Sequence, residues 1–151
     1  MTKLDRFVSE PIDLPEGDGA YSRADLVFYG VDHSGPSFEG RIFLENPAAD
    51  PTTPVDSDHG YAGSFYVLGH GGCFGEAGHC DVPTGPRDPF DLRPPHQLTP
   101  NTVTVIVTDA LQRLPGPTVR ITVVPLVRTA DGRATAGVLE FRELRLLTYA
   151  A

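Results

Sequence analysis

The segment Gly69–Asp81 concentrates the residues of this sequence that could do chemistry. It holds both cysteines of the chain and two of its five histidines, in the order His70, Cys73, His79 and Cys80. Thiolate sulfur and imidazole nitrogen together suit Zn²⁺ or Cu⁺. One interpretation is therefore a copper or zinc site made by these four residues, with the neighbouring glycines letting the backbone wrap around the ion.

The same residues allow two other interpretations. Their spacing differs from a Cys-x2-Cys zinc knuckle, and the neighbours His79 and Cys80 point apart on an extended chain. A Cys73–Cys80 disulfide would instead close a small ring and stabilise the segment by about 2–3 kcal/mol. Two buried, inert thiols are the third interpretation. A cysteine nucleophile with a histidine base is disfavoured, because the sequence shows neither an oxyanion arrangement nor an orienting third group.

Other candidate side chains lie in turns and loops. His33 and His59 fall in polar turns and His96 in a proline-rich stretch, so we expect them to be solvated or to cap backbone groups. Phe74, at the tip of the glycine-rich segment, has little core to fill and is a candidate partner contact or site plug. Tyr66 is a second such candidate, although its strand position favours a place in the core.

Composition limits the class of protein. A chain of 151 residues suits one domain, and 15 prolines with 16 glycines favour short strands joined by turns. The net charge is −8 and Lys3 is the only lysine. Nucleic acids and anionic membranes are therefore poor partners, since both need clustered basic residues.

The sequence predicts a cytoplasmic protein. Its first 23 residues contain no apolar core of signal-peptide length, and no stretch approaches the roughly 18 apolar residues of a membrane span. In a reducing cytoplasm, Cys73 and Cys80 are expected to be thiols.

Alternating apolar residues predict an all-β fold. Strands are expected at 24–32, 38–46, 60–68, 102–108, 118–127 and 136–149, the last with a bulge or tight turn near 142–143. A short helical turn capped by Thr108 should cover 109–114. We expect an antiparallel β-sandwich or barrel of six to seven strands with long loops. Residues 1–23 would be an irregular lead-in, and 24–151 a single β-sandwich domain.

One connection stands out by its length. It runs from Gly69 to Pro100, about 30 residues, and its second half carries six prolines, which exclude a helix or a central strand. A connection of this length is typically functional or packed across a surface.

The order of three motifs resembles the C-terminal β-domain of tyrosinases and polyphenol oxidases. The motifs are YAGSF at 61–65, TDALQRL at 108–114 and VRITVVP at 119–125. The runs VDHSGPSFEGRIFLENP and GHGGCFGEAGHCD are similar to the tail domain of some bacterial tyrosinase-like proteins. The resemblance covers residues 24–149. It implies a hemocyanin-like antiparallel β-sandwich that lies against a type-3 copper domain and often shields the copper site with an aromatic side chain.

The chain departs from that family in one respect. Type-3 copper sites need six histidines on helices, and five histidines cannot supply them. The resemblance therefore implies a non-catalytic accessory domain that pairs with a separately encoded type-3 copper oxidase. Residues 69–81 would be the contact element, and they could hold copper or transfer it to the oxidase. One alternative is an independent small metalloprotein or metalloenzyme that uses the Cys/His loop 70–80. The other is a structural β-sandwich whose Cys73–Cys80 disulfide holds the loop in place and which could form a homo-oligomer.

Overall fold

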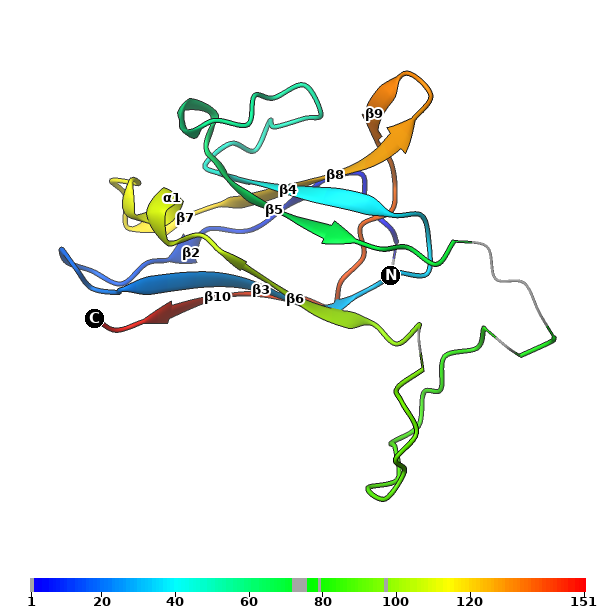
Figure 1. The fold of residues 1–151 in the computed structure, drawn as a ribbon. Coiled ribbons are helices and arrows are strands. Elements are labelled where there is room, and N and C mark those ends of the chain that lie inside the picture. The colour runs from blue at the N-terminus through cyan, green and yellow to red at the C-terminus, as the bar shows by residue number, and fades with distance from the viewer. Residues whose placement is uncertain (1, 72–75, 79, 97) are drawn as a thin grey trace.

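Two antiparallel sheets pack face to face in the computed structural model, which describes residues 2–71, 76–78, 80–96 and 98–151 (Figure 1). The described residues form ten strands, one α-helix and one 3-10 helix. Both the all-β class and the antiparallel pairing predicted from the sequence are confirmed, and the sheets do not close into a barrel.

The larger sheet has the order β1-β8-β4-β5, and β9 also pairs with β8. Its strands are β1 (Phe7–Val8), β4 (Phe38–Leu44), β5 (Tyr61–Val67), β8 (Ile121–Thr129) and β9 (Gly132–Thr135). The smaller sheet has the order β10-β3-β6, made by β3 (Arg23–Val31), β6 (Asn101–Ile106) and β10 (Glu143–Tyr149). A third, two-stranded sheet pairs β2 (Ile12–Asp13) with β7 (Thr118–Val119).

The strand count exceeds the six to seven predicted because β1, β2, β7 and β9 are only two to four residues long. Two of these short strands lie in the 1–23 segment. The stretch predicted as one strand at 118–127 is divided at Arg120 into β7 and β8. Of the predicted strand 136–149, only β10 forms, and an isolated bridge from Leu139 to Leu4 holds the residues before it.

The short helical turn forms as α1 (Thr108–Gln112), close to its predicted place. The predicted cap is wrong, because the N-cap residue is Val107. Thr108 Oγ1 instead accepts a hydrogen bond of 3.0 Å from the Ala24 amide of β3. Ser57–His59 form the 3-10 helix η1, in which Asp56 provides the N-cap.

The core lies between the two sheets. Leu26 and Phe28 of β3 and Ile42 of β4 are fully buried in it. Phe65 of β5 pairs across the sheet with Gly40, where an added Cβ would lie 2.3 Å from the Phe65 ring. The absence of a side chain at Gly40 therefore gives the Phe65 ring its place in the core.

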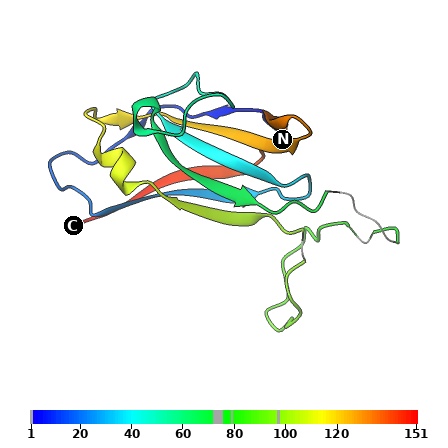
Figure 2. The same ribbon diagram turned by 45° about the horizontal axis from the view of Figure 1, so that its top comes forward.

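The 68–100 connection, called the excursion below, joins the edge strand β5 of one sheet to the edge strand β6 of the other. Its described residues extend away from the sandwich in both ribbon views (Figures 1 and 2). In the described part of the chain, no helix is long and apolar enough to cross a membrane.

Candidate functional site

The first residues of the excursion are fixed against the turn between β3 and β4. The Gly69 amide donates to Ser37 Oγ at 2.9 Å, and the His70 amide donates to the His33 carbonyl oxygen at 2.8 Å. An added Cβ on Gly69 would lie 2.2 Å from the Gly35 carbonyl oxygen. Only glycine allows the backbone to approach the turn this closely.

The ring of His33 contacts both ends of the excursion. Its ring is buried, with 5% of the residue exposed. His33 Nε2 lies 2.8 Å from the Thr99 carbonyl oxygen, and His33 Nδ1 lies 3.1 Å from His70 Nδ1. Because a carbonyl oxygen can only accept, the neutral His33 ring carries its hydrogen on Nε2 and a lone pair on Nδ1. His70 then donates its Nδ1–H to His33.

The expectation that His33 is solvated is therefore wrong, because its ring is buried, whereas the expected contact with a backbone group is found at the Thr99 carbonyl oxygen. Its backbone contacts the start of the excursion, and its ring contacts the start and the end. The predictions for the two other histidines of polar segments are confirmed. His96 Nδ1 accepts from the Leu98 amide at 3.1 Å, and His59 pairs with Asp56 at 2.6 Å.

An ion pair supports the same turn. Lys3 Nζ lies 2.8 Å from Asp32 Oδ2, and Ser34 Oγ donates to Asp32 Oδ1 at 2.8 Å. Partial burial acts to raise the pKa of Asp32, but the hydrogen bonds from Lys3 and Ser34 outweigh it and lower the pKa below its ordinary value. Asp32 is therefore ionised at neutral pH and holds the N-terminal segment next to His33.

A pocket of about 440 Å³ opens beside the two histidines. Its lining comes from β3, β5, β6 and the first residues of the excursion: Val31, His33, Tyr66, Val67, Leu68, His70, Asn101 and Val103. Tyr66 and Leu68 are 73% and 78% exposed. The prediction that Tyr66 lies in the core is wrong, since Phe65 takes that place and Tyr66 projects from the opposite face of β5. This position leaves Tyr66 available as a contact residue.

The outer part of the excursion presents two apolar side chains. The Phe90 amide donates to Asp88 Oδ1 at 2.8 Å, and the Asp91 amide donates to the Asp88 carbonyl oxygen at 3.0 Å, which defines a turn. Arg93 donates hydrogen bonds to both carboxylate oxygens of Asp91, at 2.8 and 2.7 Å. These hydrogen bonds lower the pKa of Asp91 far below its usual range. Phe90 and Leu92 are 90% and 95% exposed. Sequence reasoning missed Phe90, although an aromatic residue inside an Asp-Pro-Phe-Asp turn was the available signal.

The predicted Cys/His set is only partly described. Cys73, Phe74 and His79 lie outside the described residues, so their predicted roles stay predictions. Cys80 is disulfide-bonded in a chain with two cysteines, which differs from the thiols expected of a cytoplasmic protein. Cys80 could supply a thiolate to a metal only after reduction of that bond. The described residues contain no group of three or more histidines, cysteines or carboxylates placed to hold an ion.

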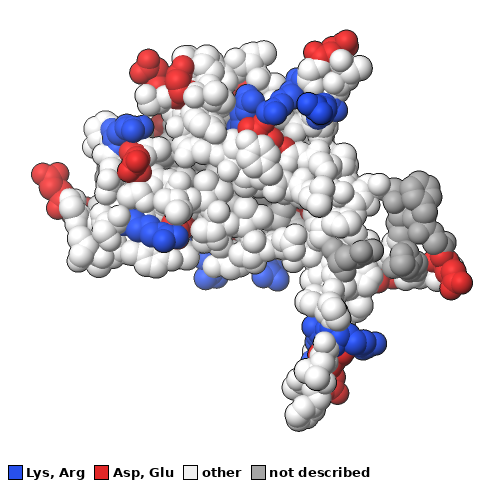
Figure 3. Space-filling view, in the orientation of Figure 1, with Lys and Arg blue, Asp and Glu red and all other residues white. Residues whose placement is uncertain are grey.

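A buried carboxylate marks the outer face of the larger sheet. Glu39 of β4, 8% exposed, accepts hydrogen bonds from Ser64 at 3.0 Å and from Arg41 at 3.3 Å, and it pairs with Arg133 of β9. Figure 3 shows basic side chains around an acidic group in this region. Two guanidinium groups satisfy one carboxylate, so we interpret the cluster as structural.

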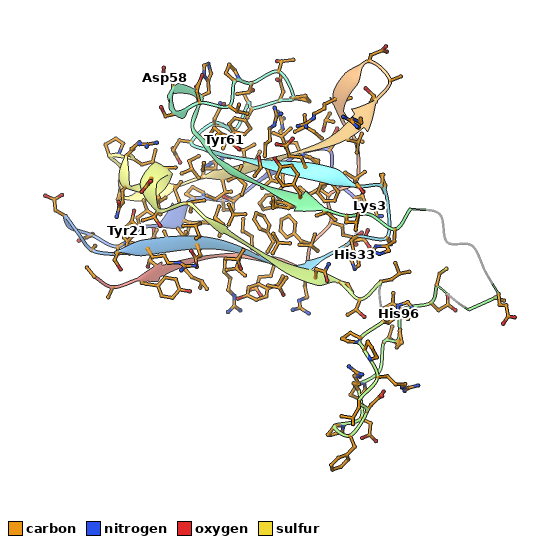
Figure 4. All side chains as sticks on the ribbon, viewed as in Figure 1. Lys3, Tyr21, His33, Asp58, Tyr61 and His96 are labelled. Atoms are coloured by element: carbon orange, nitrogen blue, oxygen red, sulfur yellow. The ribbon has the colours of Figure 1, made fainter. Side chains whose placement is uncertain are left out.

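A cavity of about 710 Å³ lies between residues 14–21 and 111–117. Burial raises the pKa of Tyr21 on its wall. Tyr21 and His33 lie toward opposite ends of the sandwich in Figure 4. The cavity therefore belongs to a different part of the molecule from the excursion, which combines paired histidines with exposed apolar groups.

Comparisons with known proteins support the fold and leave the activity open. No protein-family model matches the sequence, and no curated protein matches it. A solved structure described as recombinantly expressed latent aurone synthase, a polyphenol oxidase, superposes with a TM-score of 0.58 at 15% sequence identity. The match covers 98% of this chain and 25% of that chain, so this chain spans about a quarter of the structure that it matches. At this identity the likeness concerns the fold alone: the chain is similar in fold to a part of a polyphenol oxidase.

Proposed function

We propose that this chain is a non-catalytic accessory domain of a tyrosinase-like copper oxidase, which it stabilises or shields. The observation that carries the proposal is the fold likeness to a polyphenol oxidase over nearly all of this chain and one quarter of the other. The remaining three quarters of such an enzyme leave room for a separate catalytic part. The partner would be a type-3 copper oxidase encoded separately.

The excursion supports this proposal as the contact element. Phe90 and Leu92 project from a turn that Asp88 and Asp91 organise. An aromatic side chain held on a pre-formed turn loses little conformational freedom when it enters a pocket of a partner. Tyr66, at the base of the excursion, would extend the contact onto the sandwich, and Phe74 stays a proposed contact residue outside the described part.

The proposal is tested by mixing the purified chain with a polyphenol oxidase catalytic domain from which the enzyme's own β-domain has been removed. We expect co-elution in gel filtration and a slower oxidation of a diphenol substrate. Phe90→Ser should weaken the complex by at least about tenfold, as expected for an aromatic anchor in an interface. The matched control is Val55→Ser, because Val55 is 52% exposed on a different loop. A wild-type chain that neither binds nor slows the enzyme would contradict the proposal, and equal binding by both variants would contradict the role of the excursion.

A second candidate is a purely structural β-sandwich that associates with copies of itself. The disulfide at Cys80 favours it, because a covalently held loop needs no ion or partner to keep its shape. Sedimentation of the isolated chain separates the two candidates. A stable homo-oligomer without affinity for the oxidase domain would support the structural role.

A further inference from the structure

We propose that His33 and His70 form a binding site for a late first-row transition-metal ion, Zn²⁺ or Cu²⁺, at the base of the excursion. The site shares only His70 with the Cys/His set predicted from the sequence and needs no thiolate. It rests on the geometry of this chain alone and is independent of the proposed role beside an oxidase.

The two ring nitrogens already lie at the spacing of ligands to one ion. His33 Nδ1 and His70 Nδ1 are 3.1 Å apart, and the rings are inclined at 77° with centroids 5.0 Å apart. Zinc binds histidine nitrogen at about 2.0–2.1 Å, and tetrahedral geometry then separates two ligand nitrogens by about 3.3 Å. The ion therefore needs the two nitrogens to move slightly apart and the two rings to turn until both lone pairs point at it.

The surroundings of His33 are those of a ligating histidine. Its Nε2–H donates to the Thr99 carbonyl oxygen at 2.8 Å, which directs the lone pair of Nδ1 toward His70. A backbone carbonyl in this role typically fixes the tautomer and orientation of a metal-bound imidazole. Burial of His33 and the backbone hydrogen bond from His70 to its carbonyl oxygen hold the pair in place before an ion arrives.

Metal binding also requires a proton shift within His70. In the present arrangement, His70 donates its Nδ1–H to the lone pair of His33 Nδ1. The ion replaces this hydrogen, and the proton passes through solvent to Nε2 of the exposed His70 ring. Both rings remain neutral and each gives one lone pair to the ion, so two neutral histidines release no net proton on binding.

The adjoining pocket leaves room for further ligands. It opens to solvent beside both histidines, and Asn101 also lines it. Water would complete the coordination, as in metal sites that keep open positions. The net charge of −8 favours the approach of a cation.

The test is a calorimetric titration of EDTA-treated, non-reduced protein with zinc chloride and, separately, with copper(II) chloride. We expect one ion per chain for the wild type and an affinity at least about tenfold lower for His70→Ala. His59→Ala is the matched control, because His59 pairs with Asp56 on another loop, and it should bind like the wild type.

A second measurement keeps the proposal testable if His70→Ala folds poorly. Nitrogen-15 NMR of the wild-type histidine rings should show the Nδ1 signals of His33 and His70 moving to metal-bound values, while those of His59 stay in place. The proposal is overturned if no saturable binding occurs, if His70→Ala binds as tightly as the wild type, or if the signals that move belong to other histidines. Because no oxidase is present, failure here would leave the proposed accessory role standing.

Discussion

Replacing His33 by alanine should open the excursion while leaving the sandwich folded. The ring of His33 makes two hydrogen bonds, to the Thr99 carbonyl oxygen and to His70 Nδ1. Each contributes about 0.5–1.5 kcal/mol net. Thr99 is exposed, so water can replace its lost partner, and we expect a total of about 2 kcal/mol. Since each 1.36 kcal/mol is a factor of ten, the closed state of the excursion should become about 30-fold less favoured.

Amide hydrogen exchange in EDTA, measured by NMR, can detect this change residue by residue. The amides of His70 and Thr99 are suitable reporters, because both donate to main-chain carbonyl groups that the substitution leaves in place. Their exchange should accelerate about 30-fold, while that of Val123 in β8 stays constant. Unchanged exchange at His70 and Thr99 would refute the role of the His33 ring, and equal acceleration at Val123 would show that the ring stabilises the whole sandwich. The control variant His59→Ala should leave all three amides unaffected.

Three further predictions concern stability and ionisation. Gly69→Ala should lower the free energy of unfolding by about 1–3 kcal/mol, because its Cβ would lie 2.2 Å from a backbone oxygen. Gly85 has open space around it, so Gly85→Ala should have little effect. Equal urea midpoints for the two variants would contradict this prediction. Leu139→Ala should lower the free energy of unfolding by about 2–5 kcal/mol, because Leu139 is fully buried. Leu92→Ala should lower it by less than about 0.5 kcal/mol, because Leu92 is exposed. Thermal unfolding would contradict this if Leu139→Ala were no less stable than Leu92→Ala. The Asp91 carboxyl has a lowered pKa in the folded state, so its ion pair should be fully present above about pH 4 and lost only as the pH falls through the folded pKa. Carbon-13 NMR should place the midpoint clearly below the ordinary aspartate pKa of about 3.9, and a midpoint at that ordinary value would contradict the ion pair.

The long strands could be predicted because their side chains alternate over six or more residues. In β5, the alternation correctly separates Phe65 from Tyr66 but does not show which face is covered. Phe65 is buried because the second sheet lies on its side, and Tyr66 is exposed because nothing in the described structure packs over its ring. Strands such as β1 and β2 are too short for any periodicity, so they form through pairing with β8 and β7 alone.

The most informative site residue could not be predicted from local sequence. His33 follows an aspartate and precedes a serine, which is typical of a polar turn. Its burial depends on His70 and Thr99, which lie 37 and 66 residues further along the chain. The burial of Glu39 could not be predicted from local sequence either. Its position in β4 predicts an exposed side chain, but Arg133, 94 residues further along the chain, pairs with it and covers it. The residue types along the chain therefore predict where the excursion lies. Only the fold shows which side chains hold its two ends together.

The closure of the excursion at His33 has a consequence for how this protein can change. Both ends of the excursion meet one side chain of the sandwich, so its length and composition are largely uncoupled from the folding of the two sheets. Doubling the length of a flexible loop costs only about 0.6 kcal/mol in closure entropy. A different excursion could therefore be exchanged between His70 and Thr99 without redesign of the strands. Binding specificity and fold stability would then be inherited, and could be engineered, as separate properties of the same chain.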